Sequence, residues 1–229
     1  MSKIKRGKDL RHWRSPKNAA DIGKLRIIGG QFRGRQIRYS GDPITRPMKD
    51  DIREAIFNLV GGWVPDKVVF DLFAGTGAVG LEAISRGAKH AYLVERHFPT
   101  VRIIKENAAQ LSGDTELPIT IASSDSFFWC RKFFKNQSDW PTEPWLAFFC
   151  PPYNFYIKNE VEVVALIGRF IENAPDESLI VVESDDRFDP AKLPTCESVE
   201  GCAENRWDVR RYSPAVVSVF KKNFAVEQL

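Results

Sequence analysis

Cysteine and histidine are scarce in this chain of 229 residues, which holds four cysteines and three histidines. The two residue types do not cluster, and no two cysteines have the C-x-x-C spacing of metal sites and redox pairs. The sequence therefore indicates neither a metal centre nor a disulfide framework. Cys196 and Cys202 are near enough in sequence to pair, but a reducing compartment disfavours such a bond. The other two cysteines are Cys130 and Cys150.

Long hydrophobic runs are also missing. A helix needs roughly 20 consecutive apolar residues to span a bilayer, and no segment approaches that length. The first residues are charged and lack the apolar stretch of a signal peptide. The composition, 43% hydrophobic and 28% charged, is typical of a soluble chain with one good-sized core and a small appendage. We expect a cytoplasmic protein without a membrane partner.

Acidic residues are few at the start of the chain. Residues 1–46 hold 13 Lys and Arg against three Asp and Glu, whereas the remainder holds 20 against 27. A basic arm on an acidic body favours a polyanionic partner such as nucleic acid. The alternative is a disordered tail that charge keeps soluble.

The basic region contains a short arm and a small folded module. Residues 1–24 are rich in Lys and Arg with few apolar residues, which predicts a flexible arm. Residues 25–39 alternate apolar and polar around a glycine turn and predict a β-hairpin with an arginine-lined face. A helix is expected over Met48–Val60, ended by Gly61 and Gly62. Hairpin and helix together form a predicted N-terminal module over residues 25–62.

Strands and helices alternate from residue 63 on, in a domain predicted to reach residue 229. This alternation predicts an α/β fold whose mostly parallel sheet has helices on both faces. Near the C-terminus, two strand-like stretches at 197–209 and 215–220 predict an antiparallel hairpin that closes the sheet. The parallel strands are expected at Val68–Phe70, Ala91–Val94, Ile119–Ile121, Trp145–Phe149 and Leu179–Val182, and helices after Gly75, over Pro99–Leu111, from Ser126 and over 160–172.

Three glycines, Gly75, Gly77 and Gly80, follow the first of these strands. Glycine lets the backbone turn sharply and approach a ligand, and the next helix offers unpaired N–H groups. The spacing also matches the dinucleotide fingerprint, with Glu95 twenty residues after Gly75. By themselves the glycines do not distinguish a dinucleotide site from a methyl-donor site.

Asp71 favours a methyl donor over a dinucleotide. A carboxylate at the mouth of this turn would repel the pyrophosphate of a dinucleotide, which sits on the helix N-terminus. It suits the sulfonium and ammonium groups of S-adenosylmethionine, the cofactor we predict. The alternative for Asp71 is a helix cap.

Acidic residues after the next two strands complete the predicted cofactor site. Glu95 is expected to accept hydrogen bonds from the ribose hydroxyls, or else to be a solvated strand end. Asp125 is placed to accept the adenine amino group, and it also suits the N-cap of the helix that begins at Ser126. The predicted cofactor-binding set is Asp71, Phe73, Ala74, Gly75, Thr76, Gly77, Gly80, Glu95, Asp125 and Ser126.

The fourth parallel strand ends in Cys150, Pro151, Pro152 and Tyr153. Two prolines cannot continue a central strand, so they predict a rigid turn with unpartnered carbonyls. This turn is expected at the same edge of the sheet as the glycine loop, where open α/β sheets bind ligands.

The chain resembles the bacterial methyltransferases that modify the N2 amino group of a guanine in small-subunit (16S) ribosomal RNA. The resemblance covers about residues 25–220 and implies a Rossmann-like seven-stranded methyltransferase sheet. The Pro-Pro-Tyr corner by itself is shared with many amino-methylating enzymes. The matching pieces are Leu25–Arg35, Thr45–Pro47, Asp51–Asn58, Asp71–Ala88 and Pro151–Tyr153.

The resemblance implies how such a site works. An Asp or Asn before the prolines, with a proline-turn carbonyl, accepts the amino hydrogens and aims the nitrogen lone pair at the methyl carbon. Tyr153 would stack on the extruded base. The predicted catalytic residues are Cys150, Pro151, Pro152 and Tyr153.

Cys150 departs from the family's pattern, because a thiol is only a weak acceptor. Three alternatives follow. The carbonyl of Pro151 and a neighbouring group suffice for amino methylation; the chain is a catalytically impaired RNA-binding homologue; or Cys150 is a nucleophile for methylation at a pyrimidine carbon. We favour the first.

The resemblance also implies that the N-terminal module holds the RNA against the catalytic pocket. The partner we predict is small-subunit rRNA, either naked or within an immature small ribosomal subunit, and we expect the protein to be a monomer. Guanidinium groups suit phosphates bidentately. For Arg53, the alternative is an ion pair within its own helix. The predicted RNA-binding residues are Arg33, Gly34, Arg35, Arg38, Arg46 and Arg53.

Overall fold

The computed structural model describes residues 23–39, 47–113, 115–195 and 207–223. Nearly all of the predicted basic arm, Arg46, and the cysteines at 196 and 202 lie outside these ranges, as does most of the first C-terminal strand predicted at 197–209.

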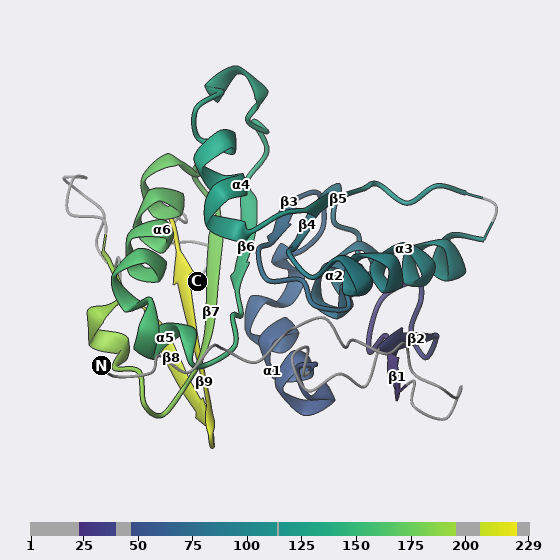
Figure 1. Ribbon diagram of the computed structural model, residues 1–229, viewed down its shortest axis with the longest axis horizontal. Helices are drawn as coiled ribbons and strands as arrows, with labels where there is room; N and C mark the ends of the chain where they lie inside the picture. The colour runs from purple at the N-terminus through teal and green to yellow at the C-terminus, as the bar shows by residue number, and fades with distance from the viewer. Residues whose placement is uncertain (1–22, 40–46, 114, 196–206, 224–229) are drawn as a thin grey trace, which may run out of the picture.

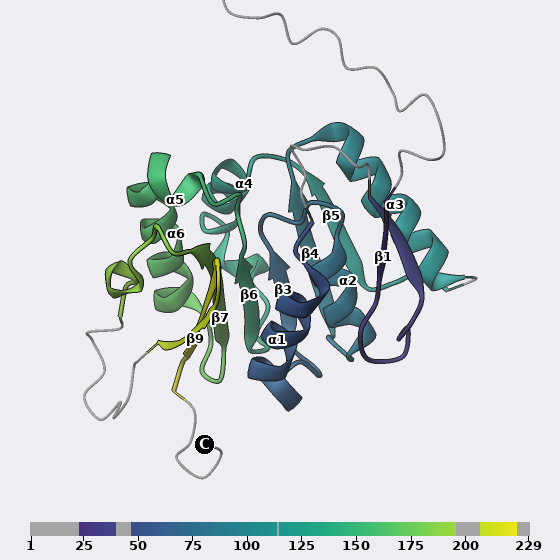
Figure 2. The ribbon, with the colours of Figure 1, turned by 90° about the horizontal axis from the view of Figure 1, so that it is seen from below.

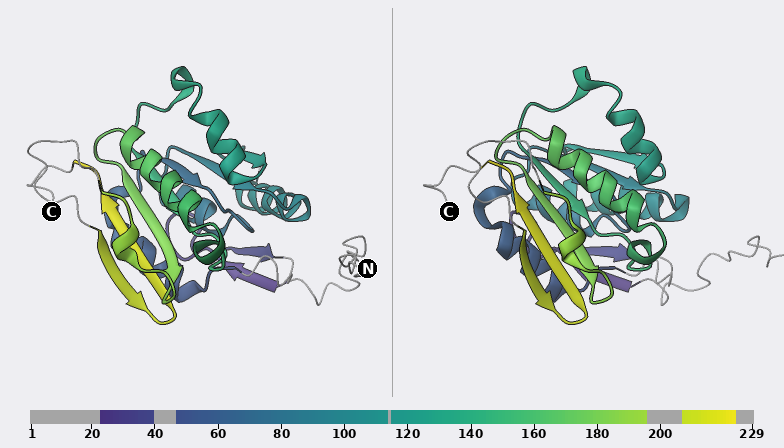
Figure 3. Two further views of the ribbon diagram at one scale, coloured as in Figure 1. Left: turned by 60° about the vertical axis from the view of Figure 1, so that its left-hand side comes forward. Right: turned by 90° about the vertical axis from the view of Figure 1, so that its left-hand side faces the viewer.

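Seven strands form one sheet in the order β5-β4-β3-β6-β7-β9-β8 (Figure 1). The first five along the chain are parallel; β9 is antiparallel to β7, and β8 is antiparallel to β9. Figure 3 shows the yellow β8–β9 hairpin at the edge of the sheet beside β7. The predicted α/β fold is confirmed. The strands are β3 (Val68–Asp71), β4 (His90–Glu95), β5 (Ile119–Ser123), β6 (Trp145–Phe149), β7 (Leu179–Asp185), β8 (Asp208–Tyr212) and β9 (Ala215–Lys221).

Helices cover both faces of the sheet. One core joins α1, α2 and α3 to one face, and a second, rich in aromatic residues, joins α4, α5 and α6 to the other. In Figure 1, α4 to α6 lie on the left and α1 to α3 on the right. The central strands β3 and β6 are buried along their whole length because both of their faces are covered. The helices are α1 (Asp50–Val60), α2 (Ala78–Ser85), α3 (Phe98–Ser112), α4 (Ser126–Phe133), α5 (Phe155–Lys158) and α6 (Glu160–Asn173).

The N-terminal hairpin of β1 (Gly23–Arg26) and β2 (Gln36–Tyr39) packs against α2 and α3 (Figure 2). Asn107 of α3 exchanges hydrogen bonds with the backbone of Arg38, at 2.8 and 2.9 Å. Glu82 of α2, fully buried, accepts the backbone N–H groups of Ile28 and Gly29 at 2.7 Å each. The hairpin is therefore joined to α2 and α3 through the buried polar side chains of Glu82 and Asn107.

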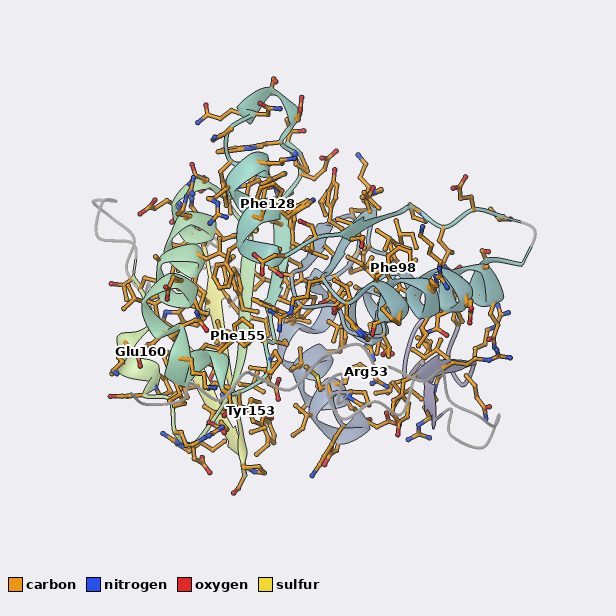
Figure 4. All side chains as sticks on the ribbon, viewed as in Figure 1. Arg53, Phe98, Phe128, Tyr153, Phe155 and Glu160 are labelled. Atoms are coloured by element: carbon orange, nitrogen blue, oxygen red, sulfur yellow. The ribbon has the colours of Figure 1, made fainter. Side chains whose placement is uncertain are left out.

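Arg53 of α1 is fully buried (Figure 4), so the prediction that its side chain contacts RNA is wrong. Its Nη2 donates to the carbonyl of Arg26 at 2.6 Å and to Asp50 at 2.9 Å, the ion pair within the helix that was the alternative. Its Nε lies 3.9 Å from Glu82 Oε2. Arg53 therefore connects α1, the hairpin and α2.

Two shifted boundaries and one missed helix are the main differences from the prediction. The helix expected from Met48 begins at Asp50, because Lys49 is extended and the acidic pair Asp50–Asp51 supplies a favourable first turn. The four-residue α5 was not predicted; such a short helix has no periodicity to detect. The first strand of the closing hairpin, expected at 197–209, lies at Asp208–Tyr212.

Candidate active site

A cavity of about 490 Å³ opens where the parallel strands end at their carboxyl edge. The glycine loop and the Pro-Pro-Tyr corner, predicted separately, both line it. So do parts of the chain that the sequence did not connect to the site: Pro47–Lys49 before α1 and Tyr212–Ala215 between β8 and β9. Of the predicted site residues, the lining includes Asp71, Phe73, Ala74, Gly75, Thr76, Glu95, Asp125, Ser126, Cys150, Pro151, Pro152 and Tyr153.

The glycines of the loop serve different purposes. Gly75 has a φ of +51° and lines the cavity, and a Cβ there would meet nothing within 4 Å. At Gly80 a Cβ would lie 2.9 Å from Leu93 Cγ. Gly80 therefore allows α2 to pack closely on β4. Gly77 and Gly80 are not among the residues that line the cavity, and a Cβ at Gly77 would lie 3.1 Å from Ile104 Cγ2.

Asp71 ends β3 and is 2% exposed. Its Oδ2 accepts the backbone N–H of Gly80 at 3.0 Å, as a helix cap would, while the side chain also lines the cavity. Burial, and secondarily the charge of Glu95, raise the pKa of Asp71 to about 7, although the hydrogen bond from Gly80 opposes the rise. The carboxylate is thus held against the cavity without a cationic partner among the described residues.

Glu95 joins two loops at the cavity. Its Oε2 accepts the N–H of Gly75 at 2.9 Å, and its Oε1 accepts the N–H of His97 at 2.7 Å. Asp125 caps α4 by accepting the N–H of Phe128 at 3.1 Å. Both carboxylates line the cavity, so backbone donors fix their orientation there.

The Pro-Pro-Tyr corner turns the chain from β6 into α5. The carbonyl of Pro152 accepts the N–H of Phe155 at 2.8 Å, so the expectation that the proline carbonyls lack partners is wrong at this position. The hydroxyl of Tyr153 donates to Glu183 Oε1 at 2.5 Å. This contact orients the ring of Tyr153, which is labelled in Figure 4, and both residues line the cavity.

Glu183 is the main functional candidate that the sequence did not reveal. It lies on β7, is 7% exposed, and lines the cavity. Burial raises the pKa of Glu183 to about 7, with a smaller rise from Asp185 and a lowering by the Tyr153 hydrogen bond. The only sequence signal is an acidic residue directly after the buried run Leu179–Val182.

Two arginines at the cavity were also missed. Arg187 pairs with Asp185 at 2.7 Å and donates to Asn154 Oδ1 at 3.2 Å. The guanidinium of Arg96 lies 5.4 Å from the ring centre of Phe155. All except Asp185 line the cavity, which places positive charge beside its acidic interior.

The predicted RNA-binding arginines fall into distinct groups. Arg33 and Arg38 are exposed, and Gly34 has a φ of +83° in the turn of the hairpin. Arg35 is exposed but donates to the carbonyls of Leu111 and Gln110 at 2.7 Å each, so it also satisfies the C-terminus of α3.

Among the described residues, no helix is long and apolar enough to cross a membrane. Within the same ranges, no three His, Cys, Asp or Glu side chains are grouped as metal ligands would be.

The parallel sheet with a reversed closing hairpin, and acidic residues around a glycine loop at its carboxyl edge, define the class of S-adenosylmethionine-dependent methyltransferases. Residues 25–205 match the family model described as "Conserved hypothetical protein 95", and the chain belongs to that family.

Named relatives agree with this class. The chain is 34% identical over 171 residues to ribosomal RNA small subunit methyltransferase D of Escherichia coli strain K12, over 73% of this chain and 78% of the relative. It is 38% identical over 87 residues to the putative rRNA methyltransferase YlbH of Bacillus subtilis, over 38% and 47% of the two chains. The resemblance to rRNA methyltransferases is thus confirmed.

Solved structures share the fold. The putative methyltransferase yhhF from Escherichia coli has a TM-score of 0.62 at 26% identity, covering 89% of this chain and all of that one. An RNA methyltransferase from Salinibacter ruber in complex with S-adenosyl-L-homocysteine has a TM-score of 0.50 at 14% identity, covering 79% and 96%. These structures confirm the predicted fold class, and with the family they confirm S-adenosylmethionine as the cofactor.

Proposed function

We propose that the chain transfers a methyl group from S-adenosylmethionine to the exocyclic N2 amino group of a guanine in small-subunit rRNA. The observation that carries this proposal is that one cavity holds both the glycine loop with its carboxylates and the Pro-Pro-Tyr corner. The names of the curated relatives support rRNA as the substrate class.

The residues present suit the cofactor. Gly75 leaves open space where a side chain would otherwise project, and Asp71 is a buried carboxylate that faces the cavity with no cationic partner in the described ranges. In the bound state Asp71 would hold the cationic amino-acid end, Glu95 the ribose hydroxyls and Asp125 the adenine amino group. The cofactor supplies an electrophilic methyl group on a sulfonium.

The other wall of the cavity would hold the base. Tyr153 presents a ring that Glu183 keeps in place, suited to stacking on an extruded guanine. The Pro151 carbonyl is available to accept an amino hydrogen. Met48 and Ile52, which also line the cavity, would exclude water from the reacting atoms.

The RNA outside the cavity would be held by cations. Arg33 and Arg38 on the hairpin, with Arg96 and Arg187 at the cavity, are the positions we assign to phosphate contacts. The predicted partner is small-subunit rRNA, naked or within an immature subunit, and the predicted state of the protein is a monomer.

Transfer of tritium from labelled S-adenosylmethionine tests the activity. We expect the purified chain to label naked small-subunit rRNA or immature small subunits, and nucleoside digestion to yield N2-methylguanosine. Failure to label either substrate would contradict the enzymatic proposal and support a silent RNA-binding homologue. A thermal shift with S-adenosylhomocysteine and none with NAD is expected as the cofactor control.

Cys150 is not expected to act as a covalent nucleophile. Burial, together with the charges of Glu183 and Asp71, raises the pKa of the Cys150 thiol, which disfavours the reactive thiolate. We expect Cys150→Ser to keep kcat within about tenfold of the unmodified chain, because another neutral group of similar size takes its place. Loss of all turnover in this variant, with cofactor binding intact, would revive methylation at a pyrimidine carbon.

A further inference from the structure

Asp71, Cys150 and Glu183 lie side by side at the cavity, at or near the carboxyl ends of the neighbouring strands β3, β6 and β7. The parallel register of β6 and β7 pairs Phe149 with Val182, so Cys150 and Glu183 are neighbours one position further along. Asp71 pairs with the residue two before Cys150 in the register of β3 with β6. Because side chains alternate along a strand, Asp71, Cys150 and Glu183 share one face of the sheet. All three line the cavity.

Glu183 is held in place with part of its carboxylate available. The hydrogen bond from Tyr153 reaches Oε1 at 2.5 Å, and in the described part of the chain it is the only one that this carboxylate accepts. Tyr153 belongs to the corner that would hold the base. A charged oxygen of Glu183 therefore lies beside both the stacking ring and the thiol of Cys150.

We propose that Glu183 is a catalytic residue, which supplies the hydrogen-bond acceptor and proton sink that the Cys150 thiol cannot supply. This inference rests on the proposed methylation of an amino group and adds the residue that receives the proton. The guanine nitrogen forms its bond to the methyl carbon, and the sulfur–methyl bond breaks with its electron pair left on sulfur. The proton lost by nitrogen passes to the Glu183 carboxylate and from there to water.

The environment of Glu183 suits this step near neutral pH. Its pKa is raised to about 7, mainly by burial, so it is ionised above that pH and binds a proton readily below it. The titratable and charged groups near it are Tyr153 from the corner, Tyr156 of α5, Cys150 at the end of β6, and Asp185, paired with Arg187, further along β7. The hydroxyl and thiol stay neutral in this range, because burial raises the pKa of Tyr153 and of Cys150.

Replacement of Glu183 by glutamine tests the proposal. The amide oxygen can still accept the hydrogen bond from Tyr153, so the fold and the tyrosine are kept while the base is lost. We expect kcat for rRNA methylation to fall by about 10²-fold. We also expect the rise in kcat between about pH 6 and pH 8, measured at saturating S-adenosylmethionine, to flatten. The Kd for S-adenosylhomocysteine, measured by calorimetry, should change less than threefold.

Glu160→Gln is the matched control. Glu160 lies on α6, does not line the cavity, and pairs with Lys192 at 2.8 Å (Figure 4). The same change of charge there should leave kcat and its pH profile unaltered.

A second site of substitution separates a chemical role from a structural one. The double variant Cys150→Asp/Glu183→Gln places an acceptor at the end of the neighbouring strand. Its kcat should be at least tenfold higher than that of Glu183→Gln alone. In the otherwise unmodified chain, the same Cys150→Asp change adds a third carboxylate beside Asp71 and Glu183. It should bring no gain in kcat. It should also shift the acidic limb of the kcat–pH profile to higher pH, because neighbouring carboxylates disfavour each other's ionisation.

The outcomes distinguish the two proposals. If the unmodified chain labels rRNA and Glu183→Gln keeps its kcat and its pH profile, the role of Glu183 is overturned while methylation stands. If kcat falls but the double variant recovers nothing, a structural role replaces the catalytic one. If the unmodified chain labels no RNA although it binds S-adenosylhomocysteine, the proposed function itself fails.

Discussion

Replacing Glu82 by alanine is expected to lower the free energy of unfolding by about 3–5 kcal/mol, the cost of removing one partner from a buried ion pair. Such a loss is a large share of the roughly 5–15 kcal/mol that stabilises a typical domain. Urea unfolding followed by tryptophan fluorescence would measure it as a lower midpoint with an unchanged slope.

The size of this effect follows from what Glu82 holds together. Its fully buried carboxylate accepts two N–H groups of the hairpin and the Nε of Arg86 at 2.8 Å. It is also the buried charge nearest to Arg53, whose Nε and Nη1 have no hydrogen-bond partner in the described part of the chain. Alanine would leave the buried Arg53 guanidinium with Asp50 as its one charged partner in the described part of the chain, and the half-buried N–H groups of Ile28 and Gly29 without their acceptor.

Glu160→Ala provides the comparison, because an exposed pair with Lys192 contributes at most about 1 kcal/mol. The loss of stability in Glu82→Gln should lie between those of Glu82→Ala and Glu160→Ala. The glutamine oxygen can still accept one hairpin N–H group, but its NH2 group faces the other and cannot accept it. An unfolding midpoint for Glu82→Ala equal to that of Glu160→Ala would show that the hairpin and α1 are held by apolar packing alone.

The glycine-loop side of the cavity was predictable because its signals are local. Asp71, Glu95 and Asp125 each stand at the end of a strand, and the ends of neighbouring parallel strands meet at one edge. The strands themselves are short apolar runs bounded by turn residues, which sequence patterns detect well.

The errors concern residues whose environment depends on distant parts of the chain. Arg53 looks like a surface residue of an amphipathic helix, and only its contacts with Glu82 and with the carbonyl of Arg26 make it internal. Glu183 follows an apolar strand with no motif around it. Its relation to Tyr153 and Cys150 arises from the pairing of β6 with β7, which no local pattern specifies.

Asp71→Asn is expected to weaken binding of S-adenosylhomocysteine by about 10²-fold at pH 8, the cost of removing one partner of a buried charge pair. The amide oxygen can keep the hydrogen bond from Gly80, so the loop stays closed. Because burial raises the pKa of Asp71 to about 7, the unmodified chain should bind more weakly at pH 5.5, where that group is protonated. Calorimetry at both pH values should find the variant's affinity nearly the same at each.

The same substitution should stabilise the free protein. A carboxyl group with a higher pKa in the folded than in the unfolded chain favours folding while protonated, so its contribution is complete below about pH 4 and is lost as the pH rises to about 7. Asparagine does not ionise. The free energy of unfolding of Asp71→Asn should therefore exceed that of the unmodified chain by about 2–4 kcal/mol at pH 8, and the two values should be equal near pH 4. Glu183 is present in both chains, so its own pH-dependent contribution to stability cancels when their free energies of unfolding are compared. Stability gained together with affinity lost would identify Asp71 as a carboxylate kept for its ligand, whereas equal stability at pH 8 would mean that the folded chain already neutralises it.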